Sequence, residues 1–166
     1  MKRRFLAVLC LFLAVCLLVG CDSYPEGNSF TYQDLTITLP GDFEELYKGT
    51  ASKDADFFYG RDTLIVMGLS EKKSDLKPMS LEEYTAYVIQ GNELTCTPER
   101  SGTGYVFSYE ATVSDTSSYT YVVTTFAGDT NFWILQFYCP TEKFHENKAE
   151  IDMILEGIKL NASKGN

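Results

Sequence analysis

The chain has 166 residues, with 23 acidic against 14 basic side chains and a formal net charge of −9. This acidic balance argues against nucleic-acid binding and against electrostatic docking on anionic lipid, because both partners are themselves negatively charged. The length suits one domain with its own core, since a chain of this size buries roughly two-thirds of its unfolded surface.

The first 20 residues predict a secretory signal. Lys2, Arg3 and Arg4 precede an apolar run from Phe5 to Val19. At about 15 residues, this run is shorter than the roughly 20 residues that cross a bilayer as a helix. The segment therefore fits an exported leader better than a membrane span.

The leader ends in Leu18-Val19-Gly20-Cys21, which resembles the lipobox of bacterial lipoproteins. That resemblance implies that the Cys21 thiol receives a diacylglycerol and that residues 1–20 are then removed. A second acyl chain makes such an anchor stable, since each buried methylene contributes about 0.8 kcal/mol. The mature chain, with a net charge of −12, is then expected on the extracytoplasmic face of the cell membrane. The alternative is an uncleaved anchor in which Cys21 is incidental.

Residues 21–29 are polar and predict a short tether, residues 30–161 a single globular domain, and residues 162–166 a tail. The first strand is expected at "LTITL", where Leu35, Ile37 and Leu39 alternate with threonines. The stretch "ADFFYGRDTLIVMGLS" predicts two further strands around a turn at residues 60–62.

The segment "MSLEEYTAYVIQGN" predicts a helix with a clear start. Ser80 and Glu83 have the spacing of a capping box, in which each side chain bonds the other residue's amide. Met79 and Tyr84 occupy the staple positions on either side of the cap, and Gly91 is expected to end the helix.

The remaining sequence predicts a short strand at "ELTCT", three longer strands joined as an antiparallel meander, and a final helix. In the last strand, "FWILQFY" is apolar on both faces, so we expect it inside the sheet with an N-terminal strand as its second neighbour. Thr141 is the expected N-cap of the final helix. Its expected apolar stripe consists of Phe144, Ile151, Leu155 and Ile158.

This order of elements predicts an α+β fold, with a single mostly antiparallel sheet of about six strands and helices packed on its faces. The segments "LTITLPGDF", "MSLEEYTAYV" and "FYCPTEKFHENKAEIDMILEGIKL" resemble the PsbP-like family of α/β/α sandwiches. The family includes extrinsic photosystem proteins and many bacterial envelope lipoproteins. The resemblance implies accessory or protein-binding roles more often than catalysis, and it supplies no catalytic motif.

Two cysteines, Cys96 and Cys139, remain in the mature chain besides Cys21. Outside the cytoplasm they can form one disulfide bridge. The alternative is two small, buried, unbridged thiols. Neither cysteine belongs to a C-x-x-C pair or to a zinc-ligand pattern.

His145 is the only histidine, and helical spacing predicts that it is exposed beside Glu142 and Glu146. The sequence also lacks the G-x-S-x-G turn that a serine–histidine–acid triad would need. The acidic loop residues do not match the spacing of an EF-hand; they are Asp42, Glu44, Glu45, Asp54 and Asp56. We therefore expect no catalytic residue, metal or cofactor.

Aromatic side chains are concentrated on two adjacent strands. Tyr105, Phe107 and Tyr109 share one face of the first, and Tyr119 and Tyr121 are expected to share the corresponding face of the next. If a helix covers this face, the rings belong to the core. If the face is open, they form an amphipathic patch of the kind found at protein interfaces.

Together these features lead us to expect a membrane-anchored, non-enzymatic accessory or protein-binding module of the cell envelope, with an envelope protein as its partner. A small-molecule-binding lipoprotein is the first alternative. An envelope enzyme using a pair of carboxylates is the second, since residues distant in sequence can meet in space.

Overall fold

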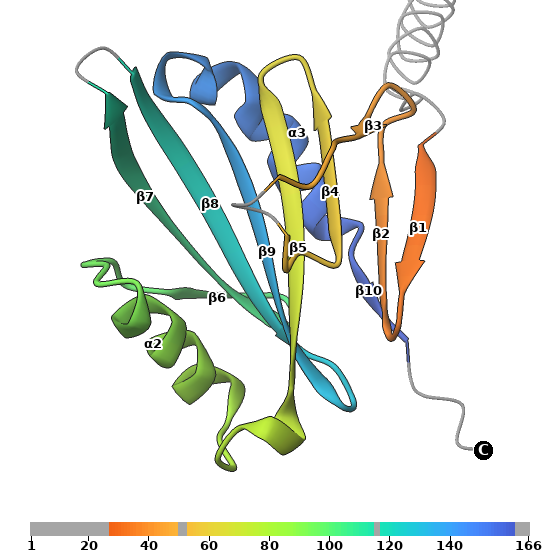
Figure 1. The fold of residues 1–166 in the computed structure, drawn as a ribbon, viewed down its shortest axis with the longest axis vertical. Helices are drawn as coiled ribbons and strands as arrows, with labels where there is room; N and C mark the ends of the chain where they lie inside the picture. The colour runs from red at the N-terminus through yellow and green to blue at the C-terminus, as the bar shows by residue number, and fades with distance from the viewer. Residues whose placement is uncertain (1–26, 50–52, 115–116, 162–166) are drawn as a thin grey trace, which may run out of the picture.

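The computed structural model describes residues 27–49, 53–114 and 117–161 (Figure 1). Its strands are β1 (Asn28–Tyr32), β2 (Leu35–Leu39), β3 (Glu44–Glu45), β4 (Phe57–Arg61), β5 (Leu64–Lys72), β6 (Glu99–Ser101), β7 (Gly104–Ser114), β8 (Ser117–Ala127), β9 (Asn131–Pro140) and β10 (Lys159–Leu160). Its helices are α2 (Leu81–Gly91) and α3 (Phe144–Glu156), with 3₁₀ turns η2 (Lys73–Asp75) and η3 (Thr141–Lys143).

These strands form two antiparallel sheets. Seven of them follow the order β3-β4-β5-β9-β8-β7-β6, and a smaller sheet has the order β1-β2-β10. The predicted α+β class is confirmed, but a single sheet of about six strands is wrong. The additional strands β1, β3, β6 and β10 are short and half-buried or exposed, so they lack the alternating apolar pattern from which strands are predicted.

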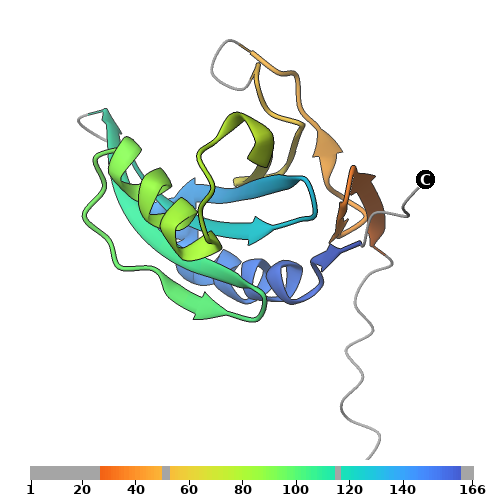
Figure 2. The ribbon, with the colours of Figure 1, turned by 90° about the horizontal axis from the view of Figure 1, so that it is seen from below.

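The two helices lie on opposite faces of the seven-stranded sheet, as Figure 2 shows. The small sheet shares one face with α3, and α2 with its flanking segments packs on the other face. Strand β9 is central: Trp133, Leu135 and Phe137 are buried on the α3 side, while Phe132 is buried on the α2 side. The prediction of an internal strand paired with an N-terminal one is confirmed, because β9 lies between β5 and β8.

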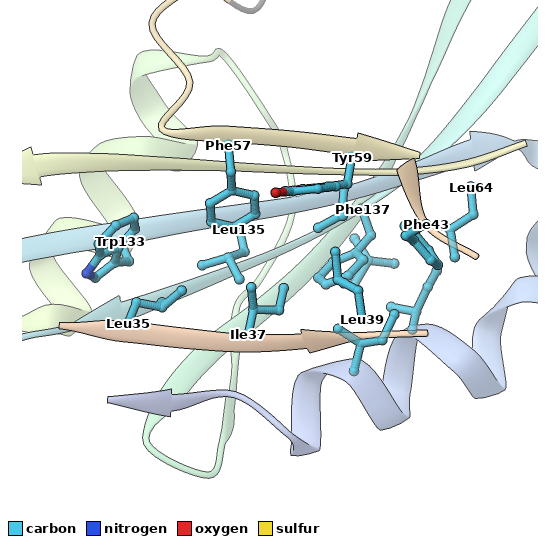
Figure 3. Close-up of a cluster of buried hydrophobic side chains, with 14 of the residues drawn as sticks. Leu35, Ile37, Leu39, Phe43, Phe57, Tyr59, Leu64, Trp133, Leu135 and Phe137 are labelled. Carbon is cyan, nitrogen blue, oxygen red and sulfur yellow. The ribbon is translucent and has the colours of Figure 1, made fainter. Parts of the chain in front are cut away.

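The small sheet packs through β2. Leu35, Ile37 and Leu39 are fully buried against rings of the large sheet that include Phe57 and Tyr59 (Figure 3). The aromatic residues of β1 extend this contact, because the ring of Tyr32 stacks on Phe57 and its hydroxyl lies 2.9 Å from that of Tyr59.

A buried carboxylate connects the two sheets. The indole Nε1 of Trp133 donates to Asp34 Oδ1 at 2.7 Å, and the backbone amide of Asp129 donates to Asp34 Oδ2 at 2.7 Å. The backbone carbonyl of Asp34 also accepts from the amide of Asn161, at 2.6 Å, just after β10. Asp34 therefore joins the β1–β2 turn, the β8–β9 turn and the C-terminal strand.

The helix starts differ in how well the sequence predicted them. The capping box of α2 is confirmed, since the Ser80 amide donates to Glu83 Oε2 at 2.7 Å and the Glu83 amide to Ser80 Oγ at 3.2 Å. The expected N-cap role of Thr141 is wrong. Thr141 lies in η3, where its Oγ1 accepts from Thr120 at 3.1 Å, and α3 begins at Phe144 without a side-chain cap.

Two strand boundaries also differ. The segment "ELTCT" is a loop and not a strand. Its first residue, Glu93, follows α2 and has a φ of 56°, which is not a strand conformation. The short strand next to β7 is instead β6. Strand β1 begins at Asn28, inside the predicted tether, because its residues pair along the whole of β2.

Gly128 offers a test of the Asp34 contact. A Cβ atom at this position would lie 2.0 Å from Asp34 Oδ2. Gly128→Ala must therefore displace a buried carboxylate that accepts two hydrogen bonds. We expect the free energy of unfolding, measured by urea denaturation, to fall by about 1–3 kcal/mol.

Gly91→Ala is the matched control. A Cβ at Gly91, in the last turn of α2, meets no atom within 4 Å. This substitution should stabilise the protein by about 0.5–1 kcal/mol, since alanine loses less backbone entropy in a helix. Equal effects at the two glycines would contradict the role given to Asp34.

Candidate functional site

Helix α2 covers only part of its sheet face. The side chains buried beneath it are Phe107, Val123 and Phe132. Tyr84 stacks on Phe132 with ring centroids 4.2 Å apart, and Thr85 Oγ1 lies 2.7 Å from Thr125 Oγ1. In Figure 1, α2 lies beside the lower part of the sheet, next to β6, and no helix of the described residues lies beside the upper ends of β7 and β8 on that side.

The uncovered part holds a cluster of four half-buried tyrosines, Tyr109, Tyr119, Tyr121 and Tyr138, which we call the tyrosine cluster. The rings of Tyr109 and Tyr121 stack almost in parallel at 4.8 Å, and those of Tyr121 and Tyr138 at 5.3 Å. Tyr119 meets Tyr138 edge-on at 6.5 Å. The four rings come from three neighbouring strands, so the strand register holds them together.

Apolar side chains continue this surface across the sheet. Ile65 pairs with Tyr138, Met67 pairs with Gln136, and Phe58 pairs with Met67. All three apolar residues are half-buried. We call the tyrosine cluster together with Phe58, Ile65 and Met67 the open face.

The structure separates the five aromatic residues that the sequence singled out. Tyr109, Tyr119 and Tyr121 belong to the open face, whereas Phe107 is buried under α2. Tyr105 lies at the edge of the helix and donates to Glu82 at 3.4 Å. Both alternatives, core and open patch, therefore hold for different members of the set.

Sequence reasoning missed Tyr138, Ile65 and Met67. Tyr138 lies in "FWILQFY", which predicts burial on both faces, and that burial holds only where α2 lies above the strand. Ile65 and Met67 belong to β5, which has no unusual aromatic content. Only the pairing of β5 with β9 brings them to the cluster.

Burial affects the ionisation of three of the tyrosines in the cluster. Loss of solvent raises the pKa of Tyr109, Tyr121 and Tyr138, and the neighbouring tyrosine hydroxyls raise it further. Gln136 Nε2 donates to the Tyr109 hydroxyl at 3.1 Å, which partly offsets the effect there. At neutral pH Tyr109, Tyr121 and Tyr138 therefore present uncharged hydroxyls, which can donate and accept hydrogen bonds.

The cysteines Cys96 and Cys139 are free thiols. Cys139 is fully buried on the α3 face, while Cys96 is half-buried and packs against the cluster under α2. The bridge allowed by the sequence is not formed, because the two thiols belong to different cores. Burial raises the pKa of both thiols, which keeps them protonated and poorly nucleophilic.

Residues considered for catalysis or metal binding are dispersed. His145, Glu142 and Glu146 are exposed on the surface of η3 and α3. Asp42 accepts from Arg61 at 3.2 Å, and Arg61 also pairs with Glu150. Among residues 27–49, 53–114 and 117–161, no three of the histidine, cysteine and carboxylate side chains come together as a metal site.

In the same described residues, no helix is both long and apolar enough to cross a membrane. Cys21 and the rest of the expected leader lie outside them.

Comparison with solved structures identifies the fold. The chain superposes on cyanobacterial PsbP (CyanoP) from Synechocystis sp. PCC 6803 with a TM-score of 0.52 and 7% identity, covering 85% of this chain and 96% of that one. The chain has a PsbP-like fold. This confirms the fold expected from the resemblance in the sequence.

A crystal structure of a protein from Bacteroides thetaiotaomicron VPI-5482 gives a TM-score of 0.62 at 12% identity. The match covers 84% of this chain but only 50% of that protein. No family model matches the chain, and no curated protein matches it in sequence. At these identities the likeness concerns the PsbP-like fold alone.

The raised pKa values of Tyr109, Tyr121 and Tyr138 predict a loss of stability in alkali. An unfolded tyrosine loses its proton near pH 10, while these three tyrosines still hold their protons in the native state, so stability falls as the pH rises. The stability that these protonated tyrosines contribute is fully present below about pH 10 and is lost as the pH rises through their native pKa values.

Urea unfolding at a series of pH values measures this slope. We expect Tyr121→Phe to make the alkaline loss of stability shallower than in the parent chain, because one such proton is removed. Tyr47→Phe is the control, since Tyr47 is 93% exposed outside the cluster. An unchanged slope in Tyr121→Phe would contradict the assignment.

The free thiols predict a graded reactivity toward Ellman's reagent in a chain that starts at residue 21 and carries Cys21→Ser. In the native state Cys96 should react slowly, while Cys139 should react only at the rate of unfolding. In denaturant without reductant, two thiols per chain should react with the reagent. If no thiol reacted, Cys96 and Cys139 would form a disulfide bridge.

Proposed function

We propose that this PsbP-like protein is a lipoprotein of the cell envelope, anchored by acylated Cys21 on the extracytoplasmic face of the membrane. It acts as a non-enzymatic module that binds an envelope protein through the open face. The observation that carries the binding role is that four tyrosines, in contact through two stacked ring pairs and one edge-on pair, remain only half-buried on a sheet face that α2 does not fully cover.

The anchor is supported by the order Leu18-Val19-Gly20-Cys21 directly after an apolar run too short for a membrane span. The acidic charge of the chain gives no attraction to anionic lipid. Lipid on Cys21 therefore has to supply the membrane affinity, and two acyl chains are sufficient for it.

The binding role is supported by the chemistry of the open face. Tyrosine combines a large apolar ring with a hydroxyl that can pair across an interface, and for that reason it is enriched at protein interfaces. Stacking fixes the rings beforehand, so that less side-chain entropy is lost on binding.

A non-enzymatic role is supported by the state of the reactive groups. The pKa of each described thiol is raised by burial, and the single histidine is exposed on a helix without a buried neighbour to activate it. Such groups lack the activation that nucleophilic or general-base catalysis requires.

The test is site-specific photo-crosslinking of the full-length protein in its own membrane, with a benzophenone residue at Tyr121 or, as the control, at the exposed Tyr47. We expect one envelope protein to crosslink from Tyr121 only. Binding of that purified protein should then weaken about 30-fold in Tyr121→Thr, as at an interface hot spot, and remain unchanged in Tyr47→Thr.

Anchoring is tested separately with Cys21→Ser, which should release the mature protein from the membrane fraction. Crosslinks of equal strength from Tyr47, or a partner that binds Tyr121→Thr at full affinity, would overturn the binding role. Retention of Cys21→Ser in the membrane would overturn the anchor and leave the binding test intact.

A further inference from the structure

A groove lies at the β6–β7 edge of the large sheet, between α3 and strands β6, β7 and β8. Most of its lining is on the α3 side of the sheet, and Cys96 and Phe107 from the α2 side also contribute to it. Its volume is 990 Å³, within the size of cavities that hold small molecules. The apolar part of its lining includes Val106 and Phe126 from the sheet and Leu155 and Ile158 from α3 and its end. Val106, Leu155 and Ile158 are only partly buried, so apolar surface is accessible in it.

Thr124 belongs to this lining and is 1% exposed. Its Oγ1 is the one hydroxyl among the buried threonines of β8 that has no hydrogen-bond partner in the described structure. The two others are paired, Thr125 with Thr85 and Thr120 with Thr141. A buried hydroxyl without a partner is unfavourable, and a ligand in the groove offers Thr124 the missing bond.

The charge of the groove is negative. Glu99, Asp152 and Glu156 line it. Asp152 is paired with Lys148, whereas Glu99 and Glu156 form no ion pair with any described residue. The basic side chain of the lining, Arg100, is engaged elsewhere: its guanidinium lies 5.8 Å from the ring of Tyr105, whose hydroxyl donates to α2.

We propose that this groove is a binding site for an organic ammonium compound with an apolar body. The apolar body packs against Val106, Phe126 and Leu155. The ammonium group is held by the free carboxylates of Glu99 and Glu156, and Thr124 accepts or donates a bond within the groove. Anionic ligands are disfavoured by the same carboxylates. Most of this site is on the other face of the sheet from the open face, and it does not depend on the proposed partner.

The test compares two probes of the same shape, 2-phenylethylamine and 2-phenylethanol, at neutral pH, where only the first is a cation. Amide chemical shifts of the isotope-labelled mature domain with Cys21→Ser are followed during titration. We expect saturable binding of the amine at millimolar affinity or better, with shifts concentrated in β6, β7, β8 and α3. The alcohol should bind about 5–10-fold more weakly.

Variants separate the groups. Glu156→Gln and Thr124→Val should each weaken amine binding about fivefold, through loss of a charge contact and of a hydrogen bond. Glu142→Gln is the control, since Glu142 is exposed in η3 outside the groove. Glu156 is itself exposed, so that variant remains informative if Thr124→Val fails to fold.

Non-specific binding of the amine to surface carboxylates would give different results from binding in the groove. Absence of saturation at millimolar amine, equal affinity for amine and alcohol, or full affinity in Glu156→Gln would each overturn the proposal. Amine binding should also weaken as salt is added, because the carboxylates lie near solvent.

Discussion

The carboxylate of Asp34 is the contact on which the layering of this molecule depends. A charged group is buried at high cost unless its oxygens are hydrogen bonded, and here Trp133 satisfies one oxygen and the amide of Asp129 the other. Because the donors belong to the large sheet and Asp34 belongs to the small one, the bonds fix the second sheet over the first. A hairpin such as β1–β2 is at best marginally stable alone, so its order follows from this docking.

Both candidate surfaces follow from that arrangement. The small sheet already covers part of one face, and α3 beside it does not reach over the edge strands, which leaves the groove next to β6 and β7. On the other face α2 is the only α-helix within the part of the chain that the structure describes, and it does not extend over the upper part of β7 and β8. Two helices and a small sheet are too few to cover both faces of seven strands. The surfaces that remain are an aromatic face on one side and an acidic groove on the other.

Local chemistry explains which elements the sequence could predict. The capping box of α2 and the doubly apolar β9 depend on neighbouring residues, and both were predicted correctly. Strand β1 is held as a hairpin partner of β2, and β10 pairs with β2 across a long sequence separation. The residues of β1 and β10 are mostly exposed or half-buried, so they lack an apolar pattern of their own. Thr141 has the composition of an N-cap, but its hydroxyl accepts a bond from Thr120. The role of Thr141 is therefore set by a contact with a residue distant in sequence, which no local sequence pattern could indicate.

The sequence left open whether a helix covers the aromatic face. The lengths of α2 and β8 explain why the cover is only partial. Helix α2 has 11 residues and is about 16 Å long at 1.5 Å per residue. Strand β8 also has 11 residues and is about 37 Å long at 3.4 Å per residue. A single helix of this length covers less than half of the strand, whatever its orientation. The rings that α2 cannot reach, those of Tyr119 and Tyr121 among them, therefore pack on one another. Their stacking shields the apolar surface in part and leaves the hydroxyls available to a partner.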